Sequence, residues 1–273
     1  MLETFGYAYM QRAMIAGILI GALCAVIGVY VVLKGLAFIG AGISHASFGG
    51  VAIGVLLGIN PVWSAVVFCV LVAWGIGLTS RKGHLKEDTA VGVFFASTMA
   101  LGVVLIRLKQ GYQIDLFSYL FGSILAVTMT DVWTTIVITA LVMTMVGVFY
   151  KDLMFVAFDS EMAEVTGVPA AKLYFLLITM MALTVVMSIK VVGVVLVSAL
   201  SVTPAAAAYQ LTEKFANMMA LAVAFGVGSC VLGLVLSVPL KTASGATIVL
   251  LSTLSFFVCA AVSPRRRRAR RTP

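Results

Sequence analysis

The sequence GLAFIGAGISHASFGGVAIGVLLGIN, residues 35–60, is an apolar run with one histidine, His45, near its middle. Small residues recur in it at every fourth position, namely Gly42, Ala46, Gly50, Gly54 and Gly58. On a helix this spacing forms one narrow stripe, along which neighbouring backbones can approach closely. An ionisable side chain inside such a run is costly, which makes His45 a candidate functional residue. The alternative is a structural histidine bonded to a backbone carbonyl between packed helices.

The composition of the whole chain indicates a membrane protein. Of its 273 residues, 62% are hydrophobic and 10% are charged, and the mean hydropathy is +1.16. Soluble domains average about 45–50% apolar and about 25% charged residues. No segment alternates like a barrel strand, and backbone groups inside a bilayer need internal hydrogen bonds. The sequence therefore predicts an all-α fold, a polytopic transmembrane helical bundle.

The apolar runs predict about eight to nine spans. The candidate spans are residues 13–33, 36–59, 61–79, 89–106, 131–150, 173–189, 191–211, 216–238 and 246–263. Nine spans and a cytoplasmic C-terminus place the N-terminus outside and most Lys and Arg residues inside, as the positive-inside rule requires. Eight or ten spans would place the N-terminus inside. We expect a multi-pass protein of the cytoplasmic membrane.

The positive charge is concentrated at the C-terminus. The net charge is +8, and six arginines lie at residues 265–268, 270 and 271, directly after an apolar run. Such a tail is better explained as an anchor at anionic lipid headgroups than as a nucleic-acid-binding arm. We predict one transmembrane domain, residues 1–263, and a disordered basic cytoplasmic tail, residues 264–273, with membrane lipid as a partner.

Two stretches differ from plain spans. Residues 111–130 are aromatic and interrupted, which favours an interfacial or re-entrant helix on the outer side. In residues 191–211, Pro204 precedes four alanines. Proline removes a backbone donor, and membrane helices tolerate the freed carbonyl where it meets protein or water. We therefore predict a helix break at Pro204 that lines a cavity or path.

The longest polar connection, residues 151–172, contains Glu161, Ala163 and Gly167 in the spacing E-x-A-x-x-x-G, followed by Pro169. This pattern predicts a short amphipathic helix that Gly167 ends in a left-handed conformation, since Pro169 prevents its continuation. A rigid projection of this kind suits docking into a groove on a partner. The alternative is an ordinary loop helix.

This connection is similar to the coupling loop of ATP-binding-cassette (ABC) permeases. Three other stretches resemble the zinc, manganese and iron importers among them: AFIGAGISHASFGGVAIG (37–54), VVGVVLVSALSVTPAAA (191–207) and SGATIVLL (244–251). DLFSYLFGSIL (115–125) extends the resemblance over most of the chain. Each motif is weak by itself, and the shared order makes the combination specific.

The resemblance implies a transport subunit with three kinds of partner. These are a cytoplasmic ATP-binding subunit, an extracytoplasmic metal-binding protein and a second permease copy, either identical or homologous. The ATPase would contact Glu161, Ala163 and Gly167. The chain itself contains no G-x-x-x-x-G-K-[ST] loop, so any ATP-driven step has to come from a partner.

The family commonly has an Asp four residues before the histidine, in the pattern G-D-x-x-S-H, whereas this chain has Ala41 at that position. A carboxylate one helical turn from an imidazole would make a two-ligand metal site. With Ala41, His45 is the main candidate for contact with the ion, and Asp115 is the second. A missing oxygen could also come from Gln113 or from a backbone carbonyl near Pro204, or the ion could pass with water still bound.

We interpret the chain as the permease of an ABC importer for a divalent transition metal, with zinc ahead of manganese and iron and with no permanently bound cofactor. The alternatives are a permease for a metal chelate or another small solute, and a stand-alone channel or structural membrane subunit. No carboxylate lies in the middle of a predicted span, which argues against a proton- or sodium-coupled carrier. No H-E-x-x-H motif or acid–base pair indicates an enzyme.

Overall fold

The computed structural model describes residues 8–83, 85–108, 122 and 127–263. Every regular element in these residues is an α-helix, which confirms the all-α prediction. The helices are α1 (Ala8–Lys34), α2 (Ala37–Leu57), α3 (Pro61–Gly83), α4 (Glu87–Leu108), α6 (Met129–Val148), α7 (Tyr150–Phe158), α8 (Ser160–Val165), α9 (Ala170–Val192), α10 (Val194–Leu211), α11 (Phe215–Leu240) and α12 (Ser244–Val262).

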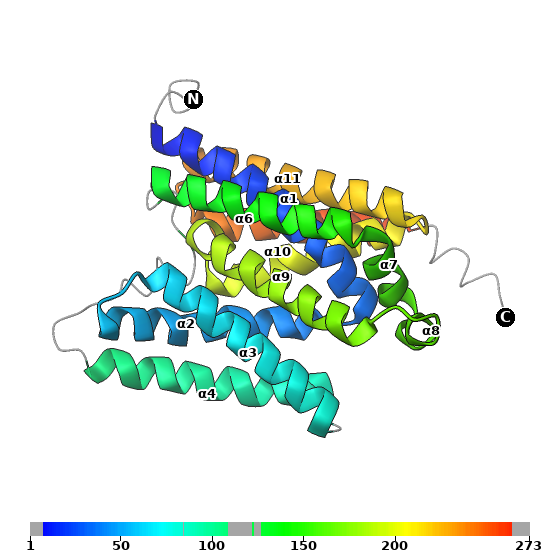
Figure 1. The fold of residues 1–273 in the computed structure, drawn as a ribbon. Helices are drawn as coiled ribbons and strands as arrows, with labels where there is room; N and C mark the ends of the chain where they lie inside the picture. The colour runs from blue at the N-terminus through cyan, green and yellow to red at the C-terminus, as the bar shows by residue number, and fades with distance from the viewer. Residues whose placement is uncertain (1–7, 84, 109–121, 123–126, 264–273) are drawn as a thin grey trace.

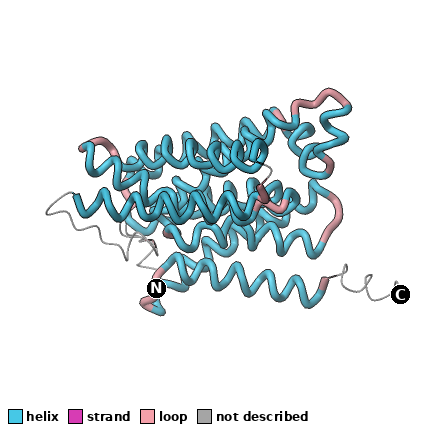
Figure 2. The backbone as a smooth tube through the Cα atoms, turned by 90° about the horizontal axis from the view of Figure 1, so that it is seen from below, coloured by secondary structure: helices cyan, strands magenta, loops and turns pink. Residues whose placement is uncertain are grey.

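The long helices lie side by side, and the short helices α7 and α8 project from one end of the bundle (Figure 1). The view from below shows the same bundle of helices from another side (Figure 2). We call the end that carries α7 and α8 the coupling end. The α1–α2, α3–α4 and α10–α11 connections lie there too, whereas α1 begins at the opposite end (Figure 1).

Two groups of helices make up the bundle. Helix α2 packs most closely against α3 and α4, while α1, α10, α11 and α12 form a second group (Figure 1). Helix α9 contacts α1, α2 and α3, and α10 contacts α2 as well as its own group. Helices α9 and α10 therefore hold the two groups together.

Eight helices of the described chain are long and apolar enough to cross a membrane. They are α1, α2, α3, α4, α6, α9, α11 and α12, and the shorter apolar helix 196–211 lies within α10. The prediction of about eight to nine spans is confirmed, and the chain is a multi-pass membrane protein. The predicted spans 173–189 and 191–211 leave a gap at residue 190. In the structure the interruption lies three residues later, at Gly193, whose φ of 92° suits glycine.

The predicted helix break at Pro204 is not found. Helix α10 continues through Pro204, which is buried, and the real interruption of this region is Gly193. Membrane helices tolerate proline where neighbouring helices and Ser or Thr side chains satisfy the backbone, and α10 is packed between α1, α11 and α12.

The small-residue stripe of α2 serves its contact with α3, as the spacing predicts. A Cβ atom added at Gly50 would lie 2.7 Å from Ala65 Cα, and one at Gly54 would lie 2.8 Å from Pro61 Cα. Any side chain at either position would push the two helices apart. Gly58 has a different function, because its φ of 70° lets it end α2 in a left-handed cap.

Two predictions lie largely or wholly outside the described residues. An interfacial helix is predicted for residues 111–130, and of this stretch the structure describes Gly122 and residues 127–130. Thr128 and Asp131 form a capping box at the start of α6. The basic tail, residues 264–273, and its predicted disorder lie outside them as well. The division into a domain of residues 1–263 and a tail stays a prediction.

Candidate metal path and coupling surface

His45 lies near the middle of α2 and is half-buried. Its ring packs edge-on against Phe95 of α4, with 4.7 Å between the ring centroids and 76° between the planes. Its Nδ1 atom is buried and has no hydrogen-bond partner among the residues that the structure describes. A buried polar atom without a partner is costly and uncommon in native structures. Among the described residues, Nδ1 therefore makes no bond to a backbone carbonyl, and the contact of His45 with a metal ion stays a prediction.

The position one helical turn before His45 holds an alanine, which offers no side-chain ligand. Ala41 is one turn before His45 and half-buried, and its carbonyl accepts the Ser44 hydroxyl at 2.9 Å. Within the described ranges there is no cluster of three or more His, Cys, Asp or Glu side chains that could hold a metal ion. Asp115 and Gln113 lie outside these ranges. Of the two predicted metal-contacting residues, His45 and Asp115, the described part of the chain thus contains His45.

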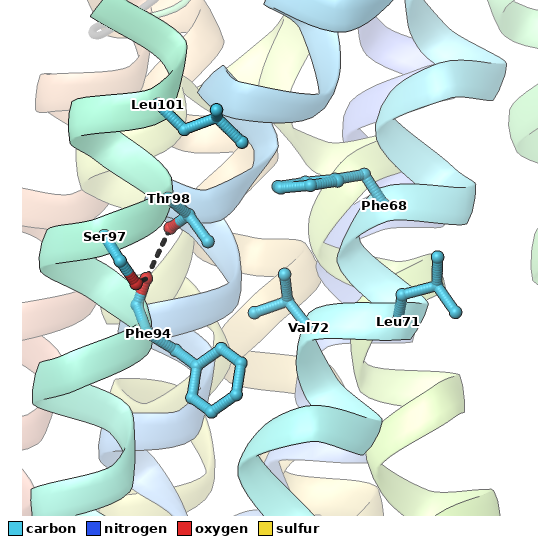
Figure 3. A pocket seen from close by; sticks show the side chains of 7 residues that line it. All are labelled: Phe68, Leu71, Val72, Phe94, Ser97, Thr98 and Leu101. Carbon is cyan, nitrogen blue, oxygen red and sulfur yellow. Dashed lines mark hydrogen bonds between the residues drawn. The ribbon is translucent and has the colours of Figure 1, made fainter.

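A groove of about 480 Å³ lies between α3 and α4 (Figure 3). Its lining is Phe68, Leu71, Val72, Phe94, Ser97, Thr98 and Leu101. The two hydroxyls in this lining donate to carbonyls of their own helix, Ser97 to Val93 and Thr98 to Phe94, at 2.7 and 2.6 Å. The groove therefore offers an apolar surface and no ligand for a metal ion.

Helix α8 is a short helix that is capped at both ends. Asp159 is its N-cap, and the carboxylate accepts from the backbone N–H groups of Glu161 and Met162 at 3.1 and 2.9 Å. Gly167 has a φ of 88° and donates to the carbonyl of Glu164, while Val168 donates to that of Ala163. This pair of bonds is a Schellman motif, so the predicted left-handed end at Gly167 is confirmed.

The residues of the E-x-A-x-x-x-G pattern point in different directions. Glu161 and Gly167 are exposed, but Ala163 is fully buried against the bundle. Ala163 is therefore an anchor of α8 rather than part of a free surface. The exposed apolar side chains of α8 are Met162, 53% exposed, and Val165, 82% exposed. Sequence reasoning missed both, because which side of α8 faces the bundle is set by distant parts of the chain.

These observations define a class of protein: a multi-pass helical membrane protein with a half-buried histidine inside the bundle and a capped apolar projection at one end. The comparisons with known proteins extend this description. The model of the ABC 3 transport family matches residues 6–263. The chain belongs to this family of ABC transport proteins, and it is a transport subunit rather than an enzyme.

Two curated relatives and one solved structure are similar over nearly the whole chain. The manganese transport system membrane protein MntC of Halalkalibacterium halodurans is 40% identical over 97% of this chain and 90% of its own length. The chelated iron transport system membrane protein YfeD of Yersinia pestis is 36% identical over 94% of this chain and 86% of its own. The structure of PsaBC from Streptococcus pneumoniae in complex with Fab has a TM-score of 0.89, with 32% identity and full coverage of both chains.

Proposed function

We propose that this chain is the permease subunit of an ABC importer that moves a divalent transition metal, manganese ahead of iron, across the cytoplasmic membrane. The observation that carries the proposal is the apolar tip of α8, exposed at the end of a bundle whose sequence has no ATP-binding loop. Such a chain needs an ATPase from elsewhere, and α8 offers the surface on which to receive it.

The ATPase docks on Met162 and Val165. Large apolar side chains that are exposed beyond the membrane mark an interaction surface. The caps at Asp159 and Gly167 hold α8 as one rigid body, and buried Ala163 fixes it to the bundle. Of the residues that the resemblance assigns to the ATPase contact, Glu161 and Gly167 border this tip, while Ala163 supports it from behind.

The coupling end faces the cytoplasm. In the described residues it carries a series of basic side chains, namely Lys34, Arg81, Lys82, Lys86, Lys151, Lys172 and Lys214. The positive-inside rule assigns such an end to the cytoplasm. Helix α12 ends there too, since Ser263 donates to the carbonyl of Gln210 near the end of α10. The end of α12 is therefore on the cytoplasmic side and the start of α1 is on the outer side, with the shorter helix α10 as the ninth crossing.

His45 contacts the ion in transit. One neutral imidazole holds a divalent ion weakly, which suits passage rather than storage, and manganese is the first and weakest binder in the order of first-row divalent ions. The relative at 40% identity is named for manganese, and the one at 36% for chelated iron. Neither name supports the sequence-based preference for zinc. The remaining ligands come from water, from a second permease copy or from residues such as Asp115.

A second candidate cargo is a metal chelate. A chelated ion brings its own ligands, so it does not need the carboxylate that Ala41 replaces. The name of the iron relative favours this alternative. In both cases the cargo is delivered from the outer side by an extracytoplasmic binding protein, and two permease copies enclose the path.

Uptake into proteoliposomes tests the proposal. Vesicles that contain this chain and its co-purified ATPase are given manganese, ferrous iron, zinc, cobalt and a ferric chelate in parallel, with ATP or with a non-hydrolysable analogue. We expect ATP-dependent uptake with manganese fastest. If the ferric chelate is taken up fastest, the cargo is the chelate and not the free ion. Uptake that is equal without ATP hydrolysis would contradict an ABC permease.

A further inference from the structure

At the coupling end, Tyr174 contacts Glu87 and Arg81, and the charges of Lys34 and Asp159 lie near enough to interact with this group. The Tyr174 hydroxyl of α9 donates to Glu87 Oε1 of α4 at 3.0 Å, and Arg81 Cζ of α3 lies 4.9 Å from the centre of the Tyr174 ring. Lys34, at the end of α1, interacts electrostatically with Glu87, Arg81 and Asp159, the N-cap of α8. We call these residues, Lys34, Arg81, Glu87, Asp159 and Tyr174, the coupling-end cluster.

The cluster is linked to α8, which we call the coupling helix, at one end and to α9 at the other. One end of it is Asp159, which caps α8, and Tyr174 is one turn into α9, the helix that follows α8. Tyr174 is buried, with 5% of its surface exposed, and Glu87 is half-buried. A movement of α8 thus reaches the Tyr174–Glu87 bond through a single short connection, residues 166–169.

Helix α4 continues from this bond to the metal path. Glu87 is its first residue, and Val91 and Phe95 follow at intervals of four, which places all three on one side of the helix. A Cβ atom at Gly42 would lie 2.8 Å from Val91 Cγ1, so α4 and α2 are in close contact there. One turn further, Phe95 packs against the ring of His45. The distance along α4 from Glu87 to Phe95 is about 12 Å at 1.5 Å per residue.

We propose that Tyr174 is a positioning residue for transport, which connects the coupling helix to His45 through Glu87 and the rigid helix α4. When the ATPase moves α8, the Tyr174–Glu87 bond makes α4 follow α9, and Phe95 shifts the His45 ring. The inference rests on the proposed function, because it assigns a role within ATP-driven transport. It adds a residue that contacts neither the ion nor the ATPase.

The test is the number of metal ions taken up per ATP hydrolysed, measured in proteoliposomes for the wild-type chain and Tyr174→Phe. The substitution removes one hydroxyl and keeps the ring on which Arg81 lies. We expect assembly with the ATPase and its rate of hydrolysis to stay within twofold of the wild type, while the ions moved per ATP fall at least threefold. A purely structural role would lower assembly and leave this ratio unchanged.

The matched control is Thr179→Val. Thr179 is five residues further along α9, and its Oγ1 accepts Trp74 Nε1 of α3 at 2.8 Å, so this variant also removes one interhelical hydrogen bond. Because that bond joins α9 to α3 and not to α4, its loss should leave the ratio of ions to ATP at the wild-type value.

Variants of Glu87 test whether the Tyr174–Glu87 hydrogen bond itself sets the number of ions moved per ATP. Glu87→Gln keeps an acceptor for the Tyr174 hydroxyl, so the number of ions moved per ATP should stay close to the wild-type value. Glu87→Ala removes the acceptor and should lower this number as Tyr174→Phe does. The double variant Tyr174→Phe/Glu87→Ala should be no worse than either single one, since both remove the same bond.

The outcomes separate the two proposals. If the wild-type vesicles show no ATP-dependent uptake, the proposed function fails and the role of Tyr174 fails with it. If the wild type is active and Tyr174→Phe has an unchanged ratio, the role of Tyr174 alone is overturned. Failure of both Tyr174→Phe and Glu87→Ala to assemble would also overturn it, because the bond would then be needed for folding rather than for coupling.

Discussion

Helix α8, the proposed ATPase contact, and the surroundings of His45, the proposed metal path, differ in how far their polar groups are satisfied within one chain. Helix α8 is finished by itself: its N-cap, its Schellman end and its buried anchor all come from residues 159–168. The site around His45 is unfinished, because Nδ1 has no partner in the described residues and Ala41 replaces the expected carboxylate.

The difference has a physical reason. A docking surface has to keep one shape while its partner moves, so its backbone groups are satisfied locally. An ion path has to release what it binds, and a site with few ligands releases an ion quickly. In the proposed function, the unpartnered Nδ1 of His45 and the fully capped α8 therefore serve opposite needs, release of an ion and rigid docking. The following changes break or sharpen the contrast.

The largest effect is expected from the double variant Met162→Asp/Val165→Asp. Charges on the exposed tip of α8 would have to be buried against the ATPase without partners, which is costly. Co-purification of the ATPase should fall at least tenfold, and ATP-dependent uptake should fall to background. The control is Leu85→Asp, an exposed apolar residue between α3 and α4 at the same end, which should retain the ATPase. Equal loss in both variants would remove α8 as the docking site.

A large but more selective effect is expected from His45→Ala. Uptake should fall about tenfold, on the order of 1.4 kcal/mol at the step that His45 assists, while assembly and ATP hydrolysis continue. Thr139→Val is the matched control, since Thr139 Oγ1 is another buried polar atom without a partner in the described chain, and it lies on α6. Uptake equal to the wild type for every metal in His45→Ala would remove this residue from the path.

Ala41→Asp sharpens the contrast in the other direction. The new carboxylate would lie one turn from the imidazole and complete a two-ligand site on one helix face. We expect the purified permease to bind manganese about tenfold more tightly, measured by equilibrium dialysis, and to transport it more slowly because release is slower. Unchanged binding would mean that the face of α2 near residue 41 does not meet the ion.

The smallest effect concerns the cap of α8. Asp159→Ala removes a side-chain acceptor at a helix N-cap, which costs about 1 kcal/mol. Hydrogen exchange at the amides of Glu161 and Met162 should therefore be about fivefold faster. Exchange in α11, far along the chain, serves as the internal control. An unchanged rate at both amides would show that α8 does not depend on its cap.

Much of the fold was predictable because it depends on local patterns. Long apolar runs fixed the spans, and the small residues at every fourth position of α2 identified its packing face. The left-handed end at Gly167 followed from a glycine placed before a proline. In each of these cases the sequence neighbours alone determine the structure.

The remaining features depend on neighbours that are distant in sequence. Ala163 is buried and Met162 exposed because of where α8 lies on the bundle, which a six-residue helix does not reveal. Pro204 does not break α10, which is packed between α1, α11 and α12. The Tyr174–Glu87 bond joins residues 87 positions apart, and no local pattern indicates it.

Pulsed EPR of bound manganese tests most directly the claim that a single imidazole, His45, meets the ion. The sequence contains two histidines, so the tag-free His84→Gln permease has His45 alone. In frozen samples of this variant with Mn²⁺, we predict modulation from an imidazole nitrogen, and we predict that it disappears when His45→Ala is added. Modulation of equal strength in both samples, or none in the first, would contradict the account.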